Sequence, residues 1–371
     1  MVPLRCFVSV LVDSFRWKRE LAMPVSVVVG GQYGSEGKGK VALDTVRRDD
    51  STTLAVRPGG TNSGHTGFSL AGRRHELRQL PAAAIDRGIG VVIPAGSYVD
   101  PDILLREIVE IGIAPSQIFV DPRAHLITNA HRAWERETAL TDTIGSTGSG
   151  TGAAVLGRAA RYAPGVPRGI PVAECDQLRP FLCDTVALMR SALSRNERIV
   201  VEGTQGFGLS PIHGEVWPKA TSRDTTAAAF LSEAGLAPSD ADDVVLVLRS
   251  HPIRVAGDSG PLMDETSWKD IALTSGGPWQ AGELTSVTQR LRRVGRFDDQ
   301  IVVRAIMTNQ PHRIVMNHLD QVDYNVAASN KMTDKASEFI VQVQDRIGRR
   351  IDTVGTGEQV LIQIGSAHVD I

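Results

Sequence analysis

Four glycine-rich segments carry most of the residues that could do chemistry. They are "GGQYGSEGKGK" (30–40), "RPGGTNSGHTG" (57–67), "GSTGSGTG" (145–152) and "VEGTQGFG" (201–208). Glycine allows backbone N–H groups to approach an anion closely, and a lysine in the same loop adds positive charge. One such loop is weak evidence, because glycine also serves ordinary turns. Four of them in one chain predict a site for several phosphate groups and a second polar ligand.

The first segment departs from the usual phosphate-binding loop. A Walker A loop runs G-x-x-x-x-G-K-[ST], and its last hydroxyl holds Mg²⁺. Here Gly39 follows Gly37-Lys38 in place of that hydroxyl residue, and Gln32 stands at the first glycine position. The hydroxyl lies upstream instead, at Ser35. The segment therefore predicts a phosphate loop of a different pattern, in which the serine needs an explanation.

The elements that must position these loops alternate between strands and helices. Residues 25–29 are expected to form a strand and residues 38–48 a helix, so the first loop lies where a helix N-terminus meets an anion. Further strand-like runs are 53–57, 90–96, 117–121, 198–203, 243–249 and 312–320, and further helical stretches are 100–112, 130–140, 177–195, 224–235 and 298–307. This alternation predicts an α/β fold with a mainly parallel central sheet and helices on both faces. Ligands of such sheets collect at the carboxyl ends of the strands.

No repeat, low-complexity tract or clear linker divides the chain, which favours a single domain over residues 23–371. Residues 254–297, rich in Gly, Ser, Thr and Arg, are expected to be a long irregular connection, and such connections are often functional. Residues 1–22 form an N-terminal extension, and the sequence leaves open whether it is dispensable.

The composition limits the class of protein. Of the 371 residues, 42% are hydrophobic and 22% charged, which is typical of a soluble globular protein, and the net charge of −2 gives no reason to expect a nucleic-acid or membrane partner. No run approaches the roughly 18 apolar residues of a membrane helix. The three cysteines, Cys6, Cys175 and Cys183, form no C-x-x-C pair, which fits a reducing cytoplasm and gives no cysteine metal cage.

The order and wording of these segments resemble the adenylosuccinate synthetase family, which joins aspartate to a purine nucleotide using a nucleoside triphosphate. Besides the four glycine-rich segments, the resemblance covers "ATSRDTT" (220–226), "SVTQRLRR" (286–293) and "NHLD" (317–320), in consistent order from about Val25 to Gly357. It implies that family's fold, a P-loop-like phosphate loop and a homodimer. It also implies a two-step reaction: the γ-phosphoryl group moves to O6 of the purine, and the aspartate amine then displaces phosphate at C6.

The resemblance assigns the phosphoryl donor to the first loop and to the C-terminal segments. The implied donor contacts are Gly34, Gly37, Lys38, Gly39, Lys40, Asp320, Gly355 and Gly357, with Mg²⁺ bridging the phosphates and Ser35 and Gly64 as metal contacts. The family's guanine-reading segment has lysine at the position of His318 and serine at that of Gly355. Because these groups support guanine, their replacement favours ATP or dATP as donor, with GTP as the alternative.

The resemblance also implies roles for the acceptor site. His65 would hydrogen-bond O6 as an electrophile or general acid, a role typically worth ~10²–10⁴ in rate, and Lys38 would act with it. The implied contacts to the monophosphate are Asn62, Thr147, Gln205 and Thr221, with Arg161 reaching across the dimer to the partner's substrate phosphate. The implied contacts to L-aspartate are Thr288, Arg290, Arg292 and Arg293, since forked guanidinium groups suit a dicarboxylate. Leu291 stands where the family has a further arginine.

In having serine at position 35, the sequence resembles the phage branch of the family. Ordinary members have aspartate there, which ligates Mg²⁺ and takes the N1 proton of inosine monophosphate, whereas the phage branch acts on dGMP to make 2-amino-2′-deoxy-N6-succinyladenylate for diaminopurine DNA. A serine leaves more room than a carboxylate beside the 2-amino group of guanine, and its hydroxyl can donate and accept. It cannot take the N1 proton unaided at neutral pH, so the route of that proton, to a phosphate oxygen or to water, stays open.

Three functions remain open at this point. The first is the dGMP-using ligase, in the host cytoplasm if the chain is phage-encoded. The second is an ordinary adenylosuccinate synthetase that uses inosine monophosphate, aspartate and GTP. The third is a nucleotide-binding regulator that has kept the fold and lost the chemistry, although a regulator would not need an aspartate clamp.

Overall fold

The computed structural model describes residues 24–86, 88–278, 282–284 and 290–364. The N-terminal extension at 1–22 and Thr288 lie outside these ranges, so the predictions made for them stay predictions.

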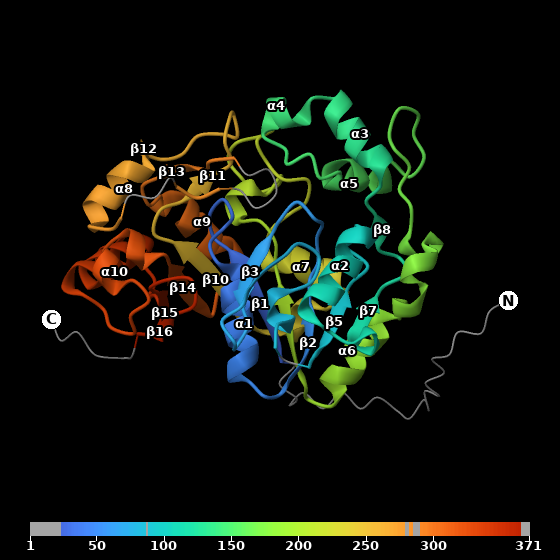
Figure 1. Ribbon diagram of the computed structural model, residues 1–371, viewed down its shortest axis with the longest axis horizontal. Coiled ribbons are helices and arrows are strands. Elements are labelled where there is room, and N and C mark those ends of the chain that lie inside the picture. The colour runs from blue at the N-terminus through green and yellow to red at the C-terminus, as the bar shows by residue number, and fades with distance from the viewer. Residues whose placement is uncertain (1–23, 87, 279–281, 285–289, 365–371) are drawn as a thin grey trace.

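A nine-stranded sheet runs through the middle of the molecule (Figure 1). In chain order its strands are β1 (Val25–Gly30), β2 (Thr52–Val56), β5 (Gly90–Ile93), β7 (Ile118–Val120), β9 (Arg198–Glu202), β10 (Ala241–Arg249), β14 (Arg313–Asn317), β15 (Thr353–Gly355) and β16 (Leu361–Gln363). The spatial order is β16–β15–β14–β10–β1–β9–β2–β5–β7, and only the β15–β16 pair is antiparallel. The predicted mainly parallel sheet is confirmed, and β1 lies near its centre.

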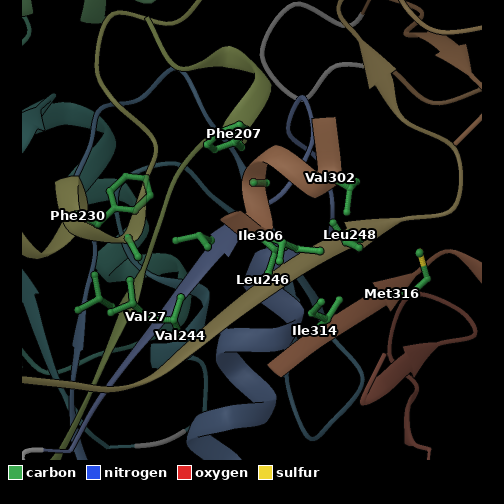
Figure 2. Packing of buried hydrophobic residues seen from close by; sticks show 14 of the residues in the cluster. Val27, Phe207, Phe230, Val244, Leu246, Leu248, Val302, Ile306, Ile314 and Met316 are labelled. Carbon is green, nitrogen blue, oxygen red and sulfur yellow. The ribbon is translucent and has the colours of Figure 1, made fainter. Parts of the chain in front are cut away.

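Helices cover both faces of the sheet because side chains alternate along each strand. Val27 of β1 packs into a large cluster with α6 (Thr185–Ser194), α7 (Ala227–Ala234), α9 (Asp299–Asn309) and α10 (Asp334–Ile347). Figure 2 shows part of this cluster, with Phe230 and Ile306 beside Val27 and Leu246. Val28 points to the opposite face and packs with α1 (Lys38–Arg48). A further cluster joins β5 and β7 to α2 (Pro101–Ile111).

Most predicted elements are present, and several others were not predicted. The helix at 38–48 is α1 with the same bounds, and the seven predicted strands correspond to β1, β2, β5, β7, β9, β10 and β14. The predicted stretch 177–195 divides into a 3₁₀ segment (Asp176–Phe181) and α6. The sequence did not predict α4 (Leu140–Ile144), α5 (Thr151–Ala160) or α10, while 130–140 corresponds to α3 (Asn129–Glu137). No helix in the described ranges is both long and apolar enough to span a bilayer.

The expectation that 254–297 is only an irregular connection is wrong for its described part. This segment contributes the helix α8 (Trp268–Ser275) and the strands β12 (Glu265–Thr266) and β13 (Arg293–Gly295). The two strands join β11 (Ile253–Arg254) in a small antiparallel sheet. Ile253, Ile271 and Val294 give it a core of its own. In Figure 1 it lies at the upper left, and α3, α4 and α5 lie at the upper right. Two further strand pairs are β3 (His65–Phe68) with β4 (Arg74–Leu77), and β6 (Tyr98–Val99) with β8 (His125–Leu126).

Candidate active site

The phosphate loop, residues 31–37, leaves the carboxyl end of β1 and leads directly into α1. Gly34, Ser35 and Gly37 have positive φ angles of 94°, 56° and 90°. At Gly37 a Cβ would also lie 2.7 Å from Nδ2 of Asn317, so this position requires glycine for space as well as for conformation. The tight turn ends at the N-terminus of α1, where free backbone N–H groups favour an anion.

Lys38 is buried, and its ammonium group lies against a carboxylate from the same loop. Nζ donates to Oε2 of Glu36 at 2.6 Å, and both side chains are almost fully buried. Oε1 of Glu36 accepts from the N–H groups of Gly34 (2.7 Å) and Gln32 (3.2 Å). These contacts brace the loop from within and hold the Lys38 ammonium group beside Glu36.

Ser35 is half-buried in this loop, and its backbone is fixed by the neighbouring strand. Its carbonyl oxygen accepts from Nη1 of Arg249 at 3.1 Å. Arg249 and Gln32 exchange two further hydrogen bonds of 2.9 and 3.1 Å between backbone and amide side chain. Within the described part of the chain, Oγ of Ser35 has no hydrogen-bond partner. The hydroxyl is therefore available to a ligand while the backbone is held still.

His65 begins β3 and is fixed by Glu202, the last residue of β9. Nδ1 of His65 lies 2.5 Å from Oε1 of Glu202. The same carboxylate accepts from Nη1 of Arg57 (3.0 Å) and from the N–H groups of Ala82 (3.2 Å) and Ala83 (3.1 Å). Nε2 of His65 is buried and has no partner among the described residues. One ring nitrogen is thus oriented by protein, and the other is left for a substrate atom.

The charges around His65 favour a neutral ring beside an ionised carboxylate. Burial and the charge of Arg57 lower the pKa of His65 to about 4, although Glu202 opposes this shift. Burial alone would raise the pKa of Glu202, but its hydrogen bond with His65 and the charge of Arg57 bring that pKa down to about 2. In this state Nδ1–H donates to Glu202 and Nε2 is an acceptor. Donation to O6 requires the protonated ring, and bound phosphate charge would favour that form.

The structure brings together three of the residues predicted to bind the monophosphate. Nδ2 of Asn62 reaches Oγ1 of Thr221 at 3.5 Å, and Nε2 of Gln205 reaches the backbone carbonyl of Asn62 at 3.5 Å. Thr147 lies apart from these contacts, in a small pocket that it shares with Arg290, Val255 and Ala256. One residue predicted to bind the monophosphate, Thr147, and one predicted to bind aspartate, Arg290, therefore line the same pocket.

The arginine segment divides its side chains between two carboxylates. Nη1 of Arg292 donates to Oε2 of Glu283 at 3.2 Å. Arg293 instead makes an ion pair with Glu265 and donates to the backbone carbonyl of Gly260 at 2.7 Å. The side chains of Arg292 and Arg293 therefore contact different groups, although both residues were predicted to hold aspartate. Thr288, the remaining member of this predicted group, is not among the described residues.

The predicted donor-base residues gather where β14 and β15 end. Nζ of Lys40 donates to the backbone carbonyl of Gly357 at 2.8 Å, and burial lowers the pKa of Lys40 to about 8 against the charge of Asp320. Burial raises the pKa of Asp320, and its Oδ1 is buried with no partner in the described chain. A Cβ at Gly355 would lie 2.1 Å from Oδ1 of Asn317 and 2.5 Å from Nζ of Lys40. This corner offers unused acceptors and one ammonium group to a base.

The residues predicted to contact Mg²⁺ fit an ion that arrives with a nucleotide. Ser35 offers a hydroxyl and Gly64 a backbone carbonyl, both of them hard oxygen ligands. Both carboxylate oxygens of Glu36 are already engaged. In the described ranges there is no group of three or more His, Cys, Asp or Glu side chains that could hold a metal. Mg²⁺ here would depend on phosphate oxygens and water for most of its ligands.

Arg161 lies at the end of α5, with φ 56° and ψ −75°. It is exposed and borders a surface cavity of about 290 Å³ formed by residues 157 and 160–168. Its neighbour Tyr162 is 92% exposed. Arg158, one turn earlier in α5, instead donates from Nη1 to the carbonyl of Ala95 at 2.7 Å. Only Arg161 of the two is placed to reach outward.

Sequence reasoning missed the acidic residues that hold the predicted cations. Glu36 and Glu202 stand inside quoted segments but were not assigned a role. Their signal was a lone carboxylate in a glycine-rich segment: Glu202 is the last residue of a buried strand, and Glu36 lies in the loop that follows one. Glu283 and Arg249 gave no such signal, because their partners lie far away in the chain.

The sequence model of the family described as "Adenylosuccinate synthetase" matches residues 27–167 and 172–329. The chain belongs to the adenylosuccinate synthetase family. Members of this family are ligases that form a C–N bond and use a nucleoside triphosphate with Mg²⁺.

Curated relatives and solved structures cover nearly the whole chain. An adenylosuccinate synthetase from Thermococcus onnurineus is 34% identical over 345 residues, which is 91% of this chain and 97% of that protein. One from Methanocaldococcus jannaschii is 32% identical over 349 residues. The cyanophage S-2L succinoaminodeoxyadenylate synthetase (PurZ), described as bound to dGMP and dATP as an energy donor, aligns with a TM-score of 0.76 at 25% identity. That alignment covers 92% of this chain and 95% of the phage protein, and it supports the phage branch of the family. A fully ligated Plasmodium falciparum adenylosuccinate synthetase aligns with a TM-score of 0.79 at 19% identity and supports the fold alone.

Proposed function

We propose that the chain joins L-aspartate to C6 of dGMP, with ATP or dATP as phosphoryl donor. The products would be 2-amino-2′-deoxy-N6-succinyladenylate, the nucleoside diphosphate and phosphate, as a step toward diaminopurine DNA. Ser35 is the observation that carries this choice: its hydroxyl is available where a carboxylate would crowd the 2-amino group of guanine. The dGMP and dATP named for the cyanophage neighbour support it. We place the reaction in the cytoplasm, that of a host cell if the chain is phage-encoded.

In the first step O6 of dGMP attacks the γ-phosphorus, and the bond from that phosphorus to the diphosphate leaving group breaks. Lys38 and the loop amides bind and orient the donor phosphates. Nε2 of protonated His65 donates a hydrogen bond to O6, and Glu202 holds the ring in place. Such positioning of reacting groups lowers the barrier without covalent participation of the protein. Mg²⁺ held with the triphosphate would neutralise charge that builds up on the phosphate oxygens.

In the second step the aspartate amine attacks C6, and phosphate leaves with the oxygen that was O6. Arg290 and Arg292 bind the aspartate carboxylates, while Asn62, Gln205, Thr221 and Thr147 hold the monophosphate. The N1 proton of guanine leaves in the first step, when O6 gains the phosphoryl group, and has two candidate acceptors: a phosphate oxygen or water, with Ser35 as the relay.

A second candidate is an ordinary adenylosuccinate synthetase that uses inosine monophosphate and GTP. The names and the 34% identity of the archaeal relatives favour it. Purified protein with aspartate, Mg²⁺ and ATP should convert dGMP, and the product should carry the mass of the succinyl adduct. Conversion of inosine monophosphate in preference to dGMP would support the second candidate. Nucleotide binding with no product from either acceptor would indicate the regulator.

The donor is tested in the same assay. His318 and Gly355 replace a lysine and a serine that support guanine in the family, so ATP or dATP should give rates at least equal to those with GTP at matched concentration. A strong preference for GTP would contradict the proposed donor and leave the acceptor proposal standing.

A further inference from the structure

We propose that Glu283, anchored by Arg249, is a positioning residue that fixes Arg292 for the carboxylate of aspartate and ties it to Ser35 of the phosphate loop. The proposal deepens the proposed function and rests on it, because it concerns the aspartate subsite. It is carried by a group of four polar side chains, Arg249, Glu283, Arg292 and Gln321, that joins three distant parts of the chain.

Glu283 is held mainly by residues other than Arg292. Arg249 donates to both of its carboxylate oxygens, from Nη2 at 2.6 Å and from Nη1 at 3.1 Å. Nε2 of Gln321 adds a hydrogen bond of 3.0 Å to Oε1. The Arg249 side chain is completely buried. A two-pronged pair with a buried guanidinium fixes both distance and orientation, so Glu283 is an anchored carboxylate.

Arg292, in contrast, gives Glu283 only one of its five N–H donors. That contact is the 3.2 Å hydrogen bond from Nη1, and Nε of Arg292 is buried with no partner in the described chain. The backbone of Arg292 is pinned on both sides: its N–H donates to the carbonyl of Glu283 at 2.8 Å, and its carbonyl accepts from the indole of Trp268 at 2.8 Å. A fixed guanidinium with unused donors is suited to a second carboxylate, that of a substrate.

The same group reaches the phosphate loop. Nη1 of Arg249, which contacts Glu283, also donates to the carbonyl of Ser35 at 3.1 Å. The Arg–Glu–Arg arrangement carries a net charge of +1, so binding one more carboxylate balances it. Through Arg249, the segment that carries Arg292 is fixed relative to the loop proposed to hold the donor phosphates. An aspartate bound to Arg292 would therefore direct its amine toward C6 of the purine.

The neighbouring pair Arg293–Glu265 supplies a matched control. Arg293 is adjacent to Arg292 in the chain, but it contacts Glu265 and the carbonyl of Gly260 within the small antiparallel sheet. This pair has no contact with Arg249 or Ser35 in the described residues. Removing the charge of Glu265 therefore perturbs an arginine of the same segment without touching the proposed positioning group.

The experiment measures KM and kcat for aspartate in Glu283→Gln, Trp268→Phe and Glu265→Gln, with whichever monophosphate the wild type accepts. Glu283→Gln keeps the shape and loses the charge, so KM for aspartate should rise about tenfold or more, as expected for a lost charge-assisted hydrogen bond. The kcat at saturating aspartate and the KM of both nucleotides should stay within about twofold. Succinate, a dicarboxylate without an amine, should lose affinity as an inhibitor by the same factor. Glu265→Gln should match the wild type.

Trp268→Phe covers the case in which Glu283→Gln does not fold. It removes the indole N–H that donates to the backbone carbonyl of Arg292 and should raise KM for aspartate about threefold. The proposal is overturned if both variants leave that KM unchanged, if Glu283→Gln lowers it, or if Glu265→Gln raises it equally. A wild type that forms product only from inosine monophosphate would contradict the dGMP proposal and leave this test intact. A wild type that needs no aspartate would overturn both.

Discussion

Ser35 combines a left-handed backbone, a fixed carbonyl and an available hydroxyl. Asp tolerates this backbone region, so Ser35→Asp should fold. Its carboxylate would face N1 and the added 2-amino group, and we expect kcat/KM for dGMP to fall ~10²-fold, the typical cost of a reacting geometry displaced by about 1 Å. Activity on inosine monophosphate should be spared or rise, because that base carries only N1–H at this edge. Steady-state kinetics with both acceptors measure the ratio, and an unchanged ratio would refute Ser35 as the selector.

Ser35→Ala separates space from chemistry at the same position. If the hydroxyl only leaves room, alanine should keep most of the dGMP turnover. If it contacts Mg²⁺ or relays the N1 proton, kcat should drop with KM nearly unchanged.

Gly355 leaves space for the side chains of Asn317 and Lys40. A Cβ at this position would come within 2.1 Å of Oδ1 of Asn317 and 2.5 Å of Nζ of Lys40. Gly355→Ser should displace one of these groups and raise the KM of the donor about tenfold or more, with little change in KM for aspartate. Gly88→Ser is a useful control for added bulk, because the nearest atom to a Cβ there is Nε2 of Gln117, at an ordinary contact distance of 3.5 Å. Equal donor KM values in Gly355→Ser and the wild type would show that this corner does not contact the base.

At the scale of elements, the long regular ones were predictable and the short ones were not. The β-branched run before the phosphate loop and the apolar spacing of α1 identified both elements because each carries its full pattern locally. By contrast, β11, β12 and β13 have two or three residues each and are held by pairing with one another. Strands of that length carry too little periodicity to be recognised from sequence.

In the candidate site, too, the residues within local motifs were predictable from the sequence, and their distant partners were not. Lys38, Ser35 and His65 could be assigned because glycine-rich segments surround them in sequence. Glu202, on β9, orients His65, and Glu283 pairs with Arg249 at the end of β10. These contacts join segments that are distant in the sequence, so they depend on the tertiary structure. Thr147 and Arg290 line one pocket only because α3–α5 and the small antiparallel sheet approach each other. Periodicity and motif spacing contain no information on such contacts.

Arg161, at the end of α5, gives a prediction about assembly. If it reaches the partner's monophosphate, Arg161→Leu should raise the KM of dGMP and leave the KM of the donor nearly unchanged. Mixing Arg161→Leu with inactive His65→Ala protein should recover activity, since one composite site of each hybrid dimer keeps both groups. Subunit exchange is verified by mass on differently tagged chains. Exchange without recovery would refute a shared site.

At the scale of the whole molecule, three histidines with a strongly lowered pKa couple stability to pH. Burial lowers the pKa of His65 and His251 to about 4 and that of His318 to about 3. The unfolded chain binds these protons near pH 6.5, so the unfolding free energy should fall as pH drops from about 6.5 toward 4, by about 1.4 kcal/mol per pH unit for each histidine. Denaturant unfolding at several pH values measures the slope. His65→Asn should reduce it by about one proton, and a stability that is flat between pH 7 and 5 would contradict the neutral histidines.

The position of β1 between β9 and β10 has a consequence for how the chain is made. β1 emerges from the ribosome early, but its two neighbours, residues 198–202 and 241–249, emerge only in the second half of synthesis. Until then the strand that carries the phosphate loop has two open edges, and open edges invite pairing with other chains. Pairings between such distant segments also form slowly. A nascent chain of this topology is therefore expected to need protection during translation, and its nucleotide site should form as one of the last local structures rather than the first.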